Sequence, residues 1–202
     1  MINDSLSQFD LYFPSVWIES KDRDWAFKNY LVLRQIESLF IESVAAYSFF
    51  KPMTAENYQD YIDKDHSPYE GCLNGLYAKS YVFALDGIGK LLSRLCHKLW
   101  PPPAVLPLVE KYNNQFGHLK HIRDSAIHIE DRGRGVTRTQ EPINTNVLVL
   151  GSFIERRFLF TGEDGKQYEV EISDVTLNCA RAIIQEIINA YSWSPSILDA
   201  RT

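Results

Sequence analysis

The sequence predicts a mainly α-helical fold, a helical bundle with one small β-hairpin before the last helix. Apolar residues recur at spacings of three and four over residues 24–51 and 72–99, which is the signature of amphipathic helices. Between residues 146 and 172 this periodicity gives way to alternation, which is typical of strands. We therefore expect at least four helices packed as one bundle, in a single domain over residues 1–202.

The chain begins with a segment, residues 1–23, that lacks helical periodicity and is expected to form an arm packed on the body. Asp24 is a candidate cap for the first long helix, and Pro52 is expected to end it. The apolar face of that helix comprises Val32, Ile36, Leu39, Phe40, Val44 and Tyr47. A short helix or loop is expected over residues 54–64.

Residues 72–99 carry the strongest helical pattern, with apolar residues on two sides. One stripe comprises Tyr77, Tyr81, Ala84, Ile88, Leu91 and Leu95, and the other Val82, Leu85, Gly89, Leu92, Cys96 and Leu99. Such a helix is either central in its own bundle or shared with a second copy, and this pattern is one of the reasons to expect a two-fold homodimer. Gly87 and Gly89 each cost about 1 kcal/mol relative to alanine, which predicts a close helix contact there.

The second half of the chain mixes helices and strands. The prolines at 101–103 are expected to open a helix that runs to about Gln115, and residues 118–131 to form the next, ending in a basic loop at Gly133 and Gly135. Strands are expected at 147–150, 153–160 and 167–172, with a turn at 161–165. Asp174 is the expected cap of the final helix.

The composition indicates a cytoplasmic protein without a membrane anchor. The three cysteines are isolated and form no C-x-x-C pair, so we expect reduced and mostly buried thiols. The N-terminus is polar, and no apolar run approaches the roughly 18 residues of a membrane span. The net charge of −5 argues against a global basic field for long nucleic acids, although a local basic strip is compatible with it.

Residues 116–131 form the one segment that resembles a catalytic motif. Phe116, Leu119, Ile122, Ala126 and Ile129 fall on one stripe of the expected helix. At ~100° per residue, the polar residues lie away from that stripe: His121, Arg123, Asp124 and His128. Asp124 precedes His128 by four residues, which is close enough to orient its imidazole.

Here the sequence resembles the HEPN family. The family hallmark is an arginine, a polar residue, a few further residues and then a histidine, near the end of a bundle helix. The chain has Arg123-Asp124-Ser-Ala-Ile-His128, which fits the shortest form. The resemblance covers roughly residues 72–131, while the hairpin and the last helix are not general features of the family.

The resemblance implies metal-independent RNA cleavage without a cofactor, in a cleft where two motifs meet across a dimer. Many members are toxins, phage-defence nucleases or RNA-processing enzymes, so a cognate antitoxin protein is an implied partner. His128 would act as general base or acid, and Arg123 would stabilise the charge on the phosphate. Asp86 matches the polar residue that the long helix of family members often places near the motif. Asp124 is expected to orient the imidazole of His128.

Further basic residues are candidates for RNA contact, namely Lys120, His121, Arg132 and Arg134. From Lys120 to Arg138 there are five basic residues against three acidic ones, a local charge of +2. Contacts to phosphate position a nucleic acid without reading its sequence. A solvated loop is the competing interpretation of these residues.

Two other functions remain open. The first is a non-catalytic RNA-binding or dimerisation module of the same fold. The second is a metal-dependent enzyme, because His121, Asp124 and His128 share a helix face at i, i+3 and i+7. A single-helix metal pair normally needs i, i+4 histidines, so we expect no metal site.

Overall fold

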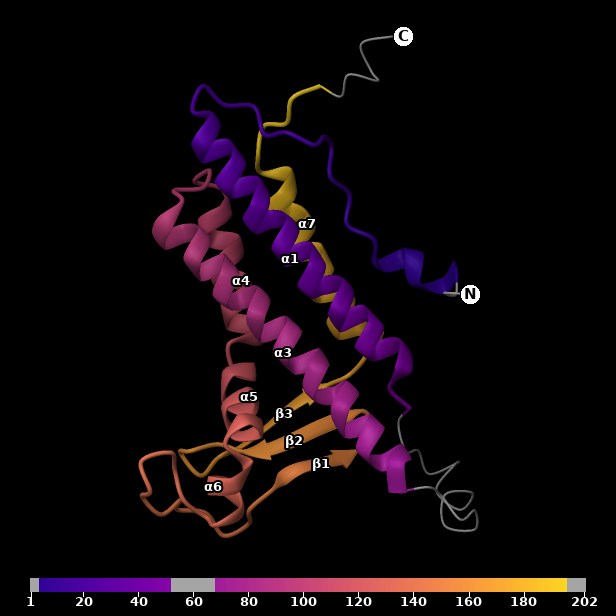
Figure 1. Cartoon of the computed structure of the whole chain (residues 1–202), viewed down its shortest axis with the longest axis vertical. Helices are drawn as coiled ribbons and strands as arrows, with labels where there is room; N and C mark the ends of the chain where they lie inside the picture. The colour runs from indigo at the N-terminus through magenta and orange to yellow at the C-terminus, as the bar shows by residue number, and fades with distance from the viewer. Residues whose placement is uncertain (1–3, 52–67, 196–202) are drawn as a thin grey trace.

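The computed structural model describes residues 4–51 and 68–195, and these contain six α-helices and a small antiparallel sheet (Figure 1). The helices are α1 (Arg23–Phe49), α3 (Pro68–Lys98), α4 (Val105–Phe116), α5 (Leu119–Ile127), α6 (Ile129–Gly133) and α7 (Asp174–Asn189), preceded by the 3₁₀ helix η1 (Asp4–Phe9). The strands are β1 (Leu150–Ile154), β2 (Arg157–Thr161) and β3 (Gln167–Glu171). The predicted mainly α fold with a small β-sheet before the last helix is thus confirmed. Pro52 and the segment expected over residues 54–64 lie outside the described residues.

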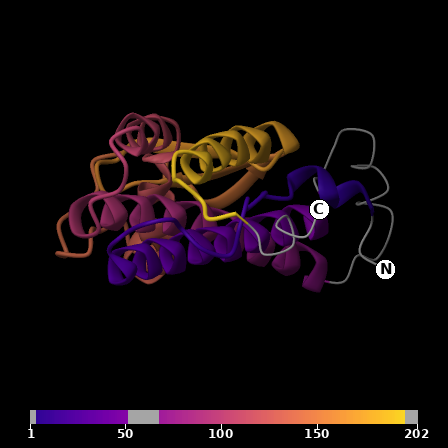
Figure 2. The same ribbon diagram turned by 90° about the horizontal axis from the view of Figure 1, so that it is seen from above.

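The long helices α1 and α3 lie side by side along the molecule, and α4 and α7 form a second layer behind them (Figures 1 and 2). The core between the layers contains Leu33, Ile36, Tyr81, Leu85, Ile88, Leu92, Ile184 and Ile188, all at most 1% exposed. Both apolar stripes of α3 are therefore covered within one chain. The doubly apolar pattern is explained by a central position, so it no longer argues for a second copy.

The predicted close contact at the α3 glycines is confirmed at Gly87. A Cβ atom there would lie 3.0 Å from Cδ1 of Leu39 on α1, which is closer than most Cβ contacts. At Gly89 a Cβ would meet the Tyr112 ring of α4 at 3.5 Å, an ordinary packing distance. Tyr112 also donates its hydroxyl to the Leu85 carbonyl at 2.9 Å, which ties α4 to α3.

Two helix caps differ from the prediction by one or two residues. Asp22, not Asp24, caps α1 by accepting a hydrogen bond from the Trp25 amide at 3.0 Å. Ser173, not Asp174, caps α7 through the Thr176 amide. Both actual caps have extended backbone, which an N-cap requires. Asp24 instead pairs with Lys28 on the helix surface.

The sheet has the order β1-β2-β3, and the first of its two hairpins differs from the prediction. The expected strand over 153–160 is split by a two-residue turn at Glu155 and Arg156, since Ile154 pairs with Arg157. Glu155 adopts φ 55, the left-handed conformation that tight hairpins need. The predicted turn at 161–165 is present between β2 and β3, where Thr161 pairs with Gln167.

Within the described ranges, none of the helices combines the length and apolar character that crossing a bilayer requires. The three cysteines are free; Cys96 and Cys179 are half-buried, whereas Cys72 is exposed, contrary to the prediction of mostly buried thiols.

Candidate functional site

Arg123 lies at the interface between α5 and α3, held from both sides by carboxylates. The flanking Ile122 is fully buried and fixes α5 against the core. The Arg123 side chain is only 13% exposed. Its Nη1 donates to Asp86 of α3, while its Nε donates to Oδ1 of Asp124 at 2.9 Å and its Nη2 to the same oxygen. The sequence placed Arg123 away from the core, but the structure holds it in an ion-pair cluster.

The charges around Arg123 leave a small positive excess. Lys90 reaches Asp86 from one turn further along α3, at 3.0 Å, and Lys120 is close enough to lower the pKa of Asp86. Three cations thus surround two carboxylates. Such an excess suits a site that receives an anion, provided that the anion can displace one carboxylate.

Burial and neighbouring charges together shift the pKa values of Asp86 and Arg123. It raises the pKa of Asp86 above its ordinary value, and Arg123 opposes that rise without cancelling it. Burial alone would lower the pKa of Arg123, but Asp124 and Asp86 outweigh it and raise that pKa. The guanidinium therefore stays charged, and Asp86 is the carboxyl that is costly to leave without a cation.

His128 lies at the break between α5 and α6. Its backbone (φ −101, ψ 38) leaves the helical region, its amide donates to the Asp124 carbonyl at 3.1 Å, and its carbonyl accepts from Arg132 at 3.0 Å. Over residues 4–51 and 68–195, no hydrogen bond or ion pair engages the imidazole, and the ring is half-buried. His128 therefore has ring nitrogens available to a ligand.

The predicted orientation of His128 by Asp124 is wrong, because the Asp124 carboxylate is taken by Arg123. The helix break also corrects the expected core stripe. Ile129 is 38% exposed and Ile127 56%, so His128 lies between two exposed isoleucines. No glycine or proline lies at this position to signal the break.

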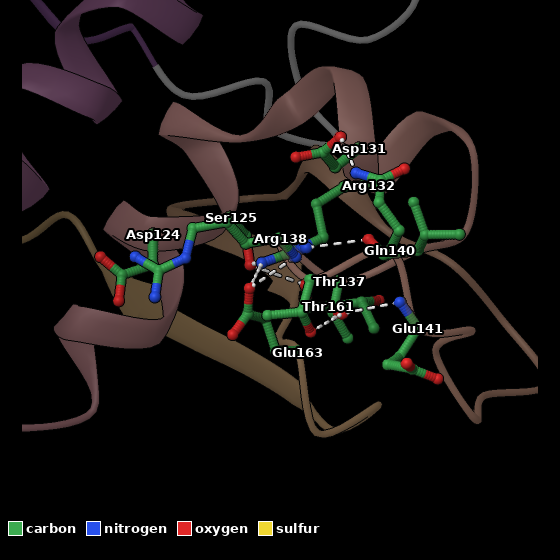
Figure 3. A network of polar contacts seen from close by, with 12 residues as sticks. Asp124, Ser125, Asp131, Arg132, Thr137, Arg138, Gln140, Glu141, Thr161 and Glu163 are labelled. Carbon is green, nitrogen blue, oxygen red and sulfur yellow. Dashed lines mark hydrogen bonds and ion pairs between the residues drawn. The ribbon is translucent and has the colours of Figure 1, made fainter.

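Arg132 does not belong to an RNA-binding surface, and its assignment as an RNA contact is wrong. Its side chain is fully buried, and its guanidinium donates to Ser125, to the Val136 carbonyl at 2.9 Å and to Glu163 at 2.7 Å (Figure 3). Glu163 also accepts from the Arg138 amide at 3.0 Å. This network ties the loop after α6 to the turn after β2.

The remaining basic candidates keep contact with solvent. Arg134 is 63% exposed and pairs with Asp131, and Lys120 is exposed. His121 stacks on Tyr168 of β3, with ring centroids 4.2 Å apart and planes 9° apart. Tyr168 was not among the predicted site residues, because its alternation with Val170 indicated only a strand.

No three histidine, cysteine, aspartate or glutamate side chains converge into a metal-binding group in the described part of the chain. Asp124, which the metal hypothesis required, is engaged by Arg123 instead. The structure therefore brings together Arg123, Asp86 and Asp124, and sets His128 apart from them.

No family model matches the chain, and comparisons with curated proteins and with solved structures find no match.

Proposed function

We propose that the chain is a HEPN-type, metal-independent endoribonuclease that acts as a homodimer in the cytoplasm, as a toxin or phage-defence component with a cognate antitoxin. The observation that carries the proposal is an arginine held by carboxylates, followed five residues later by a histidine whose ring makes no hydrogen bond. Arg123 is fixed by Asp86. The His128 imidazole makes no hydrogen bond or ion pair among the described residues, although it lies near enough to Asp131 to lower the pKa of that carboxyl.

The chemistry follows from the two side chains. A neutral His128 takes the proton of a ribose 2′-hydroxyl, whose oxygen then forms a bond to the adjacent phosphorus as the bond to the 5′-oxygen breaks. The departing 5′-oxygen takes a proton from the protonated His128 of the second copy in the proposed dimer, and the products carry a 2′,3′-cyclic phosphate and a 5′-hydroxyl. Arg123 donates to the phosphate oxygens as their charge increases.

Access to Arg123 depends on which carboxylate the phosphate replaces. Asp86 is 9% exposed at its side chain, whereas Asp124 is 35% exposed and engages two nitrogens of the fork. We infer that the phosphate displaces Asp124 and leaves Asp86 in place. Asp124 is thus a competitor for the substrate site rather than an orienting residue.

A second copy would supply the missing proximity. No contact joins the Arg123 and His128 side chains within the described part of one chain. The exposed isoleucines that flank His128 make this segment a candidate dimer surface, since a two-fold contact repeats the same patch on both partners. The lack of contact between Arg123 and His128 within one chain also favours the alternative function, an RNA-binding module that does not cleave RNA.

The test is an assay of single-stranded RNA in EDTA, with a matched pair of carboxylate variants. Asp124→Asn removes the competitor and is expected to lower KM several-fold with cleavage retained. Asp86→Asn is expected to reduce kcat, because it frees the guanidinium to move. RNA with 2′-O-methyl groups should resist cleavage, since it lacks the nucleophile. Binding without any cleavage would instead support the module.

A further inference from the structure

Beyond Arg123, the outer face of α3 carries a row of basic residues that the motif does not explain. Lys90, Arg94 and Lys98 follow Asp86 at intervals of four residues, which places them on one side of the helix. The Lys90 side chain is 59% exposed, and Arg94 and Lys98 are exposed as well. The row begins at the residue that holds Arg123.

The row is not neutralised by its surroundings. From Gly87 to Val109 the sequence contains no aspartate or glutamate. Arg94 and Lys98 have no ion-pair partner among the described residues. On the neighbouring helix α1, Asp24 pairs with Lys28 and Glu37 with Arg34. Lys90 pairs with Asp86, so the uncompensated positive charge on this face of α3 is that of Arg94 and Lys98, although the whole chain is acidic.

The row ends at an exposed aromatic ring. Trp100 is 79% exposed and has φ 48, a conformation that is rare for a bulky residue. Its carbonyl accepts a hydrogen bond from the Trp25 indole at 3.1 Å, which holds the strained backbone. The three prolines that follow stiffen the connection to α4. The fold thus holds the backbone of a large, exposed apolar side chain two residues after the last cation of the row.

We propose that this face of α3 is a track for single-stranded RNA that leads away from Arg123. Four helical residues rise ~6 Å, a step that consecutive phosphates of an extended strand can match. Phosphates lie on Lys90, Arg94 and Lys98 in turn, and a base stacks on Trp100. The track defines the substrate as an unpaired strand at least several nucleotides long on one side of the cut. It rests on the proposed function only in taking RNA as the ligand.

The test is a binding measurement that does not require cleavage. A fluorescent uridine oligonucleotide of about ten nucleotides, with 2′-O-methyl groups throughout, is titrated with the protein at several salt concentrations. The variant is Arg94→Gln/Lys98→Gln, which leaves the Asp86–Arg123 cluster intact. The matched control is Lys21→Gln/Arg156→Gln, which removes the same charge from exposed, unpaired positions elsewhere in the described chain.

We expect the track variant to bind about tenfold more weakly near physiological salt, and its slope of log affinity against log salt to fall by about 1.4, at ~0.7 per phosphate contact. The control should match wild type.

Trp100→Leu should weaken binding about fivefold or more, and this loss should disappear with an abasic oligonucleotide. Equal affinities for the track variant and the control would overturn the proposal. The proposal would also be overturned if the track variant bound RNA as tightly as wild type but lost binding to anionic vesicles or to an acidic peptide. A wild-type protein that never cuts RNA but shows the expected losses would refute the nuclease and leave the track standing.

Discussion

At the scale of single residues, the decisive feature is where two arginines are buried. The pattern of residues 116–131 identified Arg123 as a candidate, and the family resemblance identified Asp86 on the long helix. Neither could show that the two residues form one cluster, because they are 37 positions apart. Arg132 was misjudged for the same reason. Its partners are Glu163 and a backbone carbonyl at Val136, and the neighbouring glycines suggested an open loop instead. Periodicity predicts which face a residue occupies, and not which distant group meets it there.

Arg123→Ala is expected to lower the free energy of unfolding by about 3 kcal/mol, the lower end of the range for breaking a buried ion pair. The loss arises because Asp86 keeps its burial and loses its main cation. Denaturant unfolding of the single variant and of Arg123→Ala/Asp86→Asn measures it. The double variant should recover most of the loss. A single variant as stable as wild type would show that the cluster is solvated.

Glu163→Gln is expected to destabilise the fold by about 1–3 kcal/mol at neutral pH, less than for a fully buried pair because Glu163 is 46% exposed. The Arg138 amide and Arg132 lower the pKa of Glu163 below its ordinary 4.5. A carboxylate with a lowered folded pKa stabilises above its unfolded pKa and loses that effect as the pH falls. The stability difference between wild type and variant should therefore shrink below about pH 4.5. Chemical denaturation over a pH series tests this, and a constant difference would contradict it.

At the scale of elements, the sequence predicted the kinds of structure better than their boundaries. The three-four periodicity over 24–51 and 72–99 corresponds to α1 and α3. The two helices pack on each other, α1 also packs on α7, and α3 packs on α4 and α5. The break at His128 and the turn at Glu155 were missed. Neither has a glycine or proline, so each bend is imposed by tertiary contacts rather than by local propensity.

Gly165→Ala tests the turn between β2 and β3. Gly165 has φ +76, and a Cβ there would lie 2.1 Å from the Asn144 carbonyl oxygen. We expect a loss of at least about 2 kcal/mol, from left-handed backbone strain plus the displaced backbone. Gly133→Ala is the matched control, since a Cβ at Gly133 meets open space and stability should change little. Thermal melts of both variants measure the difference, and similar melting temperatures would show that the turn relaxes freely.

At the scale of the whole molecule, one chain buries a complete core but does not bring Arg123 and His128 into contact. The covered faces of α3 remove the original reason to expect a dimer. The surface around His128 supplies a different reason, because Ile127 and Ile129 remain exposed there. A helical bundle with a small sheet was predictable from periodicity. The separation of the Arg123 and His128 side chains was not, because it depends on packing between residues far apart in the sequence.

The dimer prediction is that analytical ultracentrifugation finds twice the 23.3 kDa of one chain at micromolar concentration. Ile127→Glu should shift the mass toward the monomer, because a charge would be buried at the contact. Val175→Glu, at a 69% exposed position on α7, is the control and should leave the mass unchanged. A wild-type monomer would remove the composite site and weaken the nuclease proposal.

The proposed nuclease activity is measured by the yield of 2′,3′-cyclic phosphate ends from single-stranded RNA in EDTA, for wild type and His128→Ala. We expect cleavage by wild type and a loss of about 10²–10⁴-fold in the variant, the usual contribution of a general acid or base. His128 makes no side-chain hydrogen bond within the described residues, so the variant should keep its melting temperature. His118→Ala, whose imidazole instead interacts with the backbone of Glu169, should cut RNA but melt lower. Equal cleavage by wild type and a folded His128→Ala protein would refute the proposed role of His128.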